Sequence, residues 1–228
     1  MRLSDLEPVE QEIQEPVQGV DDIVVVYGGR FQPPHKGHYA VYKHLVGLFG
    51  ADKTFIGTSN SCDIENKGQL FKAGKNKGLP KPVKSPFNFL EKFKIWTTMF
   101  QVPQDKVIQC INPTFTPKEI LDGYSGNEAL VMAVGEKDFE ERYKDSDHWL
   151  LYPGNKRFET VKDELYPMSY KGYCIIVPMQ EDGISASVVR KTLGSTAPLE
   201  KKQEAFVKLY GKFDEEIFNL IVSKVEGI

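Results

Sequence analysis

The sequence predicts an α/β fold in which a doubly wound, Rossmann-like parallel sheet carries helices on both faces. Short, continuously apolar runs recur along the chain, as expected of strands that are covered on both faces. Helical patterns separate these runs, and this alternation is typical of right-handed strand–helix–strand units. The length of 228 residues corresponds to one large domain. Ligands of such folds bind at the carboxyl ends of the strands, so we expect the chemistry there.

The predicted elements follow one another in order from Ile23, where the clearest apolar run begins. Five strands are expected, over residues 23–27, 54–57, 107–110, 129–134 and 173–177. Helical patterns cover residues 39–49 and 86–100, the second with Ser85 as N-cap and Pro86 in its first turn. Thr116 and Glu119 form a capping-box pattern that opens a short helix. Ser185 is the expected N-cap of a helix that Gly194 ends, and residues 199–225 predict one or two helices broken near Gly211.

The domain boundaries follow from the same patterns. Residues 1–21 are acidic and polar and predict a disordered or loosely docked leader, or else a targeting or processed segment. Residues 22–198 are expected to form the main domain, with residues 199–228 as a C-terminal helical segment packed on it.

Composition excludes several classes of protein. A net charge of -3 gives no general reason to expect nucleic acid as a partner, and no apolar run approaches the ~20 residues needed to span a bilayer. The three cysteines are far apart and lack the spacing of a zinc site or a disulfide framework. These features favour a cytoplasmic protein.

The first candidate site lies where the first strand ends and a helix begins. Gly28 and Gly29 allow a sharp turn and a close approach of ligand to the backbone, and Gly37 leaves the helix N-terminus open to an anion. His35 and His38 are three residues apart, so both can face one ligand and donate hydrogen bonds to phosphate oxygens. Two such histidines can also cap a helix or bind a metal. We expect no metal site, because neither His44 nor His148 supplies a convincing third ligand.

A second candidate site is the helix start around Ser185. With Ser187 in the first turn and Arg190 one turn later, it suits a polyphosphate, although an ordinary capped surface helix has the same pattern.

Three further features are weaker candidates for contacts with a ligand. The stretch 66–84 holds six lysines, Lys72 and Lys75 among them, and no acidic residue, so it predicts a mobile loop that closes on phosphates or a solvated surface loop. At the end of the fourth strand lie Gly135, Lys137 and Asp138. Trp96 fits the core, whereas Trp149 is expected in a polar loop, where it could stack on a base.

The segment Gly29–His38 resembles the signature of the nucleotidyltransferase superfamily that carries the HxGH motif, a compact relative of the catalytic domain of class I aminoacyl-tRNA synthetases. Its form GRFQPxHxGH is especially similar to nicotinamide mononucleotide adenylyltransferases. From about residue 22 onward the chain also resembles, more loosely, cytidylyltransferase-like proteins of large tailed phages, and a phage protein would act in the host cytoplasm. Residues 184–190 resemble the family's ISxTxxR motif, with Ser187 in place of threonine.

The resemblance implies an enzyme that transfers a nucleoside monophosphate from a nucleoside triphosphate to a phosphorylated small molecule and releases pyrophosphate. It implies Mg²⁺ carried by the triphosphate, with His38 at the α-phosphate and His35 at the bridging or β-phosphate oxygens. It places Ser185, Ser187 and the catalytic Arg190 at the departing pyrophosphate. The remaining nucleotide contacts are then expected from Gly28, Gly29, Arg30, Phe31 and Gly37. Gly135 and Asp138 resemble the family's loop that contacts a ribose or the acceptor, and Lys72, Lys75, Lys137 and Trp149 are further candidates for such contacts.

Two alternatives remain open. ATP with a nicotinamide mononucleotide-like acceptor is favoured over CTP, because the family's cytidylyltransferases carry RTxGIS where this chain has residues 181–185, EDGIS. The other alternative is a non-catalytic nucleotide-binding or virion-associated protein that keeps the fold as a scaffold. The sequence specifies neither the oligomeric state nor the acceptor.

Overall fold

The computed structural model describes residues 19–177 and 184–228, and it confirms the predicted fold class. A single six-stranded sheet, in which all neighbouring strands are parallel, has the order β3-β2-β1-β4-β6-β5. The chain builds outward from β1 on one side and then returns to add β4 on the other, so the strand order reverses between β1 and β4. The strands are β1 (Ile23–Gly29), β2 (Thr54–Thr58), β3 (Val107–Gln109), β4 (Ala129–Val134), β5 (Trp149–Leu151) and β6 (Gly172–Ile176).

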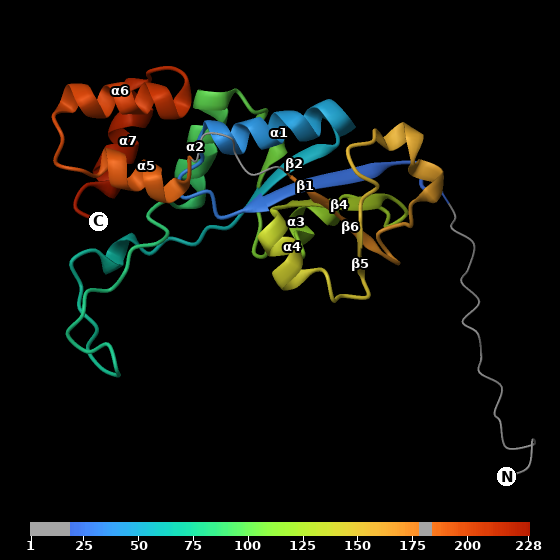
Figure 1. Ribbon diagram of the computed structural model, residues 1–228, viewed down its shortest axis with the longest axis horizontal. Coiled ribbons are helices and arrows are strands. Elements are labelled where there is room, and N and C mark those ends of the chain that lie inside the picture. Colours follow the sequence, from blue (N-terminus) through green and yellow to red (C-terminus); the bar gives the residue numbers. More distant parts are fainter. Residues whose placement is uncertain (1–18, 178–183) are drawn as a thin grey trace, which may run out of the picture.

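Helices cover both faces of this sheet (Figure 1). In β1, Val25 and Tyr27 face the larger core, while Val24 and Val26 face the smaller one. This alternation explains why the whole strand is apolar. The larger core packs under α1 (Lys36–Phe49) and α2 (Phe89–Phe100), and the smaller one under α3 (Lys118–Leu121) and α4 (Glu136–Arg142).

The C-terminal helices pack beside α2, on the side of the larger core (Figure 1). They are α5 (Ala186–Leu193), α6 (Leu199–Tyr210) and α7 (Glu215–Val225). The predicted break near Gly211 is present, since Gly211 ends α6 in a left-handed conformation with φ 84°. The prediction that Ser185 caps a helix ended by Gly194 is also confirmed for α5.

Several predicted boundaries are wrong. Helix α2 begins three residues later than expected, because Asn88 and Glu91 form a capping box and Ser85 instead donates its N–H to Asp63. No side-chain cap opens α3, where Pro117 occupies the N-cap position.

Strand β5 was not predicted at all. It has only three residues at the sheet edge, and the exposed Leu150 and Leu151 give no burial pattern. Trp149, expected in a loop, begins this strand.

The N-terminal leader lies mostly outside the described residues. The stretch 178–183 also lies outside them, and it includes residues 181–183, the first three of EDGIS. Val20, which we assigned to the leader, is buried and donates its N–H to the carbonyl of Lys162. Within the described ranges, no helix is both long and apolar enough to cross a membrane.

Candidate active site

The carboxyl end of β1 is pressed against the loop that follows β3. A Cβ atom on Gly28 would lie 1.8 Å from the carbonyl oxygen of Pro113, so a side chain at this position would displace the loop. Gly28 is therefore needed for backbone packing as well as for the turn. The adjoining Thr114 lines the same cavity as the motif that follows β1.

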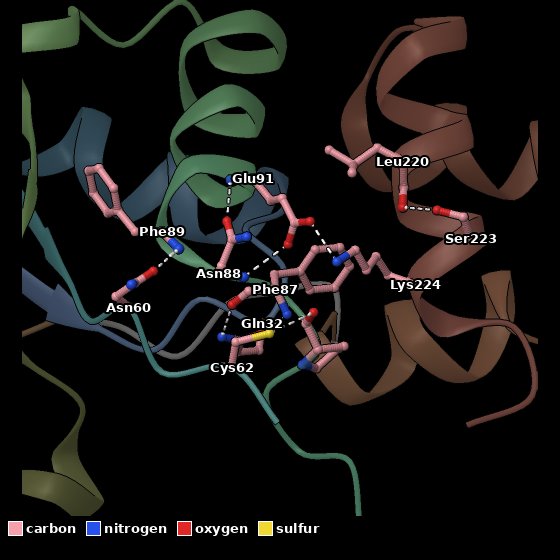
Figure 2. Close-up of polar contacts among 11 residues, drawn as sticks. Gln32, Asn60, Cys62, Phe87, Asn88, Phe89, Glu91, Leu220, Ser223 and Lys224 are labelled. Atoms are coloured by element: carbon pink, nitrogen blue, oxygen red, sulfur yellow. Dashed lines mark hydrogen bonds and ion pairs between the residues drawn. The ribbon is translucent and has the colours of Figure 1, made fainter. Parts of the chain in front are cut away.

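The Gln32 side chain fastens this motif to the segment before α2. Its Oε1 accepts from the N–H of Phe87 at 2.9 Å, and its Nε2 donates to the carbonyl of Phe87 at 2.8 Å. Figure 2 shows this pairing beside Glu91, which bonds to Asn88 at the start of α2 and to Lys224 of α7. The motif loop, α2 and α7 are thus linked through buried or partly buried polar contacts.

Phe31 supports the histidines rather than projecting into solvent. It has a left-handed backbone, with φ 44°, and its side chain is buried. Its ring centroid lies 4.9 Å from that of His38 and 5.3 Å from that of Trp96, both in edge-on geometry. A bulky residue with positive φ is uncommon, and here this backbone directs the ring under His38. Trp96 is fully buried, as predicted.

His35 and His38 lie at the N-terminus of α1 with their rings stacked, 3.7 Å between centroids. His35 is the N-cap residue, is 0% exposed and makes no side-chain cap. Among the described residues, nothing hydrogen-bonds to either ring nitrogen of His35, although buried polar atoms are nearly always satisfied. Burial lowers the pKa of His35 to about 4, and burial followed by the charge of His35 holds the pKa of His38 well below its usual range. At neutral pH both rings are therefore uncharged in the free protein.

A cavity of about 750 Å³ lies over the carboxyl ends of β1, β4 and β6 and brings together most of the predicted residues. It includes the switch point between β1 and β4, where α/β folds of this type bind ligands. Its volume is typical of small-molecule sites. The predicted residues that line it are Gly28, Gly29, Arg30, Phe31, His35, His38, Gly135, Lys137, Asp138 and Ser185.

Arg190 and Ser187 lie beside this cavity rather than in its lining. Arg190 donates through Nη1 to the carbonyl of Gln32, and its Nη2 lies 3.4 Å from Oγ of Ser187. Burial and then the charge of Arg30 lower the pKa of Arg190, whereas Asp63 acts in the opposite direction. The α5 start is thus joined to the histidine motif, and two guanidinium groups make this edge positive.

At the end of β4, the polar residues are already engaged with one another. Gly135 is the N-cap residue of α4. Asp138 pairs with Arg142 at 3.7 Å, and Lys137 pairs with Glu141 at 3.6 Å, all in exposed positions. These pairs are weak, so a ligand can replace them at little cost.

Other predicted residues are not brought to the cavity. The lysine-rich segment forms a hairpin-like arm that projects away from the sheet (Figure 1, teal to green), and neither Lys72 nor Lys75 lines the cavity. The ring of Trp149 packs against Tyr143 at 5.2 Å, between β5 and α4. Gly37 is buried in the first turn of α1.

Sequence reasoning missed cavity residues whose types carry no local pattern. Thr114 comes from a loop, and Arg142 and Tyr143 come from the end of a short helix. Only their position near the ends of β3 and β4 could have indicated them.

In the part of the chain that the structure describes, no three His, Cys, Asp or Glu side chains cluster in a way that could hold a metal ion.

Solved structures similar to this chain include two of the nicotinic acid mononucleotide adenylyltransferase of Plasmodium falciparum, complexed with NaAD and with APC. Each has a TM-score of 0.49 and covers 89% of this chain and 95% of that chain, at 14% and 13% identity. A putative nicotinate-nucleotide adenylyltransferase from Vibrio parahaemolyticus has a TM-score of 0.45 and 11% identity, and covers 88% of this chain and 99% of that chain. No family model and no curated protein matches the sequence.

The depressed pKa of His35 predicts a pH-dependent stability. The unfolded chain binds a proton near pH 6.5, whereas folded His35 does so only near pH 4, so the free energy of unfolding falls as pH drops through this window. On acidification from about pH 7 to about pH 4, the free energy of unfolding of a His35→Gln variant should fall by about 3 kcal/mol less than that of the wild type. Denaturant unfolding of both proteins between about pH 7 and about pH 4 measures the difference. Parallel curves would contradict the assigned pKa.

Proposed function

We propose that the protein is a nucleotidyltransferase that moves a nucleoside monophosphate from a nucleoside triphosphate onto a phosphorylated small-molecule acceptor. One observation carries the proposal. His35 is buried at the N-terminus of α1 with both ring nitrogens unsatisfied among the described residues, and it lines a cavity that Ser185 of α5 also lines. Phosphate oxygens would satisfy such a histidine, and helix N-termini favour phosphates.

In the proposed reaction, an acceptor phosphate oxygen attacks the α-phosphorus. A new P–O bond forms as the bond to the β-phosphate oxygen breaks, and pyrophosphate leaves. No protein nucleophile is needed, so catalysis consists of positioning and charge stabilisation. His38 donates to the α-phosphate as charge develops, and His35 donates to the bridging or β-phosphate oxygens. Ser185, Ser187 and Arg190 hold the pyrophosphate. To bind it, Arg190 gives up its hydrogen bond to the Gln32 carbonyl.

The proposed substrates are ATP and a nicotinamide mononucleotide-like acceptor, on the strength of the GRFQPxHxGH form of the motif. Gly28, Gly29 and Arg30 border the cavity where the nucleotide would lie. Lys137 and Asp138 border it at the end of β4, where they would contact the acceptor or a ribose. Mg²⁺ would enter on the triphosphate and neutralise part of its charge.

A pyrophosphate-release assay tests the proposal. Each of the four nucleoside triphosphates is combined with several phosphorylated acceptors, nicotinamide and nicotinic acid mononucleotides among them. We expect release with ATP and one of these two acceptors, while release only with CTP would identify a cytidylyltransferase. If no combination releases pyrophosphate although the protein binds nucleotides in calorimetry, the fold serves as a binding scaffold and the proposal is wrong.

The lysine-rich arm is proposed to close on the phosphates. Its backbone bonds within itself, with the N–H of Phe71 donating to the carbonyl of Leu79 and that of Gly78 to Phe71. Beyond its base it projects from the molecule (Figure 1), and Lys72 and Lys75 are exposed. Bound phosphates would attract these lysines through charge-assisted hydrogen bonds.

We therefore predict that amide hydrogen exchange in residues 66–84 slows when ATP and acceptor bind together. The double variant Lys72→Gln, Lys75→Gln should lose this protection, whereas the control Lys201→Gln, Lys208→Gln on exposed positions of α6 should keep it. Equal exchange with and without saturating ligands would identify the arm as a solvated surface feature.

A further inference from the structure

Lys92 is a buried cation beside the site, and the proposed mechanism does not use it. It lies in α2 and is 0% exposed. Its Nζ donates to the carbonyl of Arg30 at 3.1 Å, to Oγ1 of Thr58 at 2.9 Å and to the carbonyl of Ser59. All three acceptors are neutral, so within the described residues no carboxylate compensates this charge.

An uncompensated ammonium in the interior is unfavourable, because burial disfavours its charged form. Burial accordingly lowers the pKa of Lys92 to about 8, which Cys62 opposes only in part. The other buried lysine, Lys202 in α6, has the usual solution, since its Nζ lies 3.3 Å from a carboxylate oxygen of Glu226. Lys92 therefore differs from Lys202 in lacking an anionic partner.

The three acceptors of Lys92 lie at the carboxyl ends of two neighbouring strands. Arg30 directly follows β1, and Thr58 and Ser59 end and follow β2. The ammonium thus holds the turn after β1 against β2 at the point where Phe31 takes its positive φ and reaches His38. A change in this turn would shift the support of His38.

The charges around this turn are mostly positive. The charge of Arg30 acts on Arg190, and Lys92 bonds to the carbonyl of Arg30. Asp63 is the acidic group that acts on Arg190, and its carboxylate already accepts the N–H groups of Lys84 and Ser85. A polyanion in the cavity would therefore meet a net positive electrostatic field from these cations.

We propose that Lys92 is a positioning residue of the nucleotide site, which fixes the turn at Arg30 and whose uncompensated charge strengthens binding of a polyphosphate. This role rests on the proposed function, since it requires that the cavity binds a nucleotide. A purely structural strut would need the hydrogen bonds of Lys92 and not its charge.

Calorimetric binding of ATP, without acceptor and at fixed free magnesium, tests the role. Lys92→Met keeps the length of the side chain and removes the charge, and it should weaken ATP binding by about tenfold or more. Lys202→Met, which removes the other buried lysine and lies outside the cavity lining, should leave the affinity unchanged. Circular dichroism and thermal unfolding establish that each variant folds.

The pH dependence of binding separates the two roles. In the wild type, ATP affinity should fall as pH rises through about 8, the pKa of Lys92. The phosphates of ATP stay ionised in this range, because the last phosphate pKa is about 6. Lys92→Met should lose this dependence, and Lys92→Arg should retain affinity at high pH. If Lys92→Met fails to fold, the pH profiles of ATP binding to the wild type and to Lys92→Arg still show whether the charge of Lys92 matters.

The possible failures are distinguishable. A wild type that binds ATP with no change through this pH range, or a folded Lys92→Met with wild-type affinity, overturns the role of Lys92 and leaves the proposed function intact. A wild type that binds no nucleotide at any pH overturns the proposed function itself.

Discussion

Replacement of His38 by alanine is expected to lower turnover by at least about 100-fold while the protein stays folded. Loss of one preorganised hydrogen-bond donor to a transition-state oxyanion has an effect of about this size. His38 lines the cavity at the start of α1, and its ring is supported on one side by His35 and on another by Phe31. The imidazole is therefore held in a fixed position before any ligand arrives.

The measurement is kcat for pyrophosphate release, made with the substrate pair that the wild type uses. His148→Ala is the matched control, because His148 is exposed in the loop before β5 and lies outside the cavity lining. It should retain wild-type turnover. A folded His38→Ala protein with near-wild-type kcat would show that the α-phosphate lies elsewhere.

Residues that line the cavity could be identified from the sequence where they are neighbours in the chain. Gly28, His35 and His38 lie within eleven positions of one another, and the strand–turn–helix pattern around them has one common three-dimensional solution. Ser185 was identified for the same reason, because an N-cap is a local feature. Both segments could therefore be located without knowledge of the tertiary structure.

Contacts over long separations could not be predicted in this way. The amide of Gln32 bonds to the backbone of Phe87, and Lys92 bonds to the carbonyl of Arg30, 62 positions away. Backbone acceptors have no residue type, so no pattern in the sequence indicates them. The arm was identified as lysine-rich, but its distance from the cavity depends on how its base packs.

The position of Arg190 is the clearest case of a residue whose type was predicted but whose contacts were not. We expected its guanidinium at the phosphates, whereas it bonds to the carbonyl of Gln32 beside the cavity. This contact links α5 to the histidine motif. A carbonyl is a weaker partner for a guanidinium than a phosphate, which offers charged and bidentate hydrogen bonds.

Replacement of Arg190 by alanine is accordingly expected to weaken triphosphate binding by about 10- to 100-fold, as for loss of a charge-assisted hydrogen bond worth ~1.5–3 kcal/mol. Binding of the matching nucleoside monophosphate should change much less, because the proposed partners are the β- and γ-phosphates. Calorimetry with both nucleotides gives the two losses. Arg157→Ala, which removes an exposed arginine outside the cavity lining, is the control and should affect neither.

The contact with Gln32 gives this experiment a second informative outcome. If Arg190 acts only by bracing the motif loop, its loss would loosen the whole nucleotide site, and the two nucleotides would lose affinity equally. The Ser187→Ala variant then helps to separate the roles, because Ser187 lies 3.4 Å from Nη2 of Arg190 and has no bond to the Gln32 carbonyl. A selective loss for the triphosphate in both variants would place the pyrophosphate at the start of α5, whereas equal losses in Arg190→Ala would place it elsewhere in the cavity.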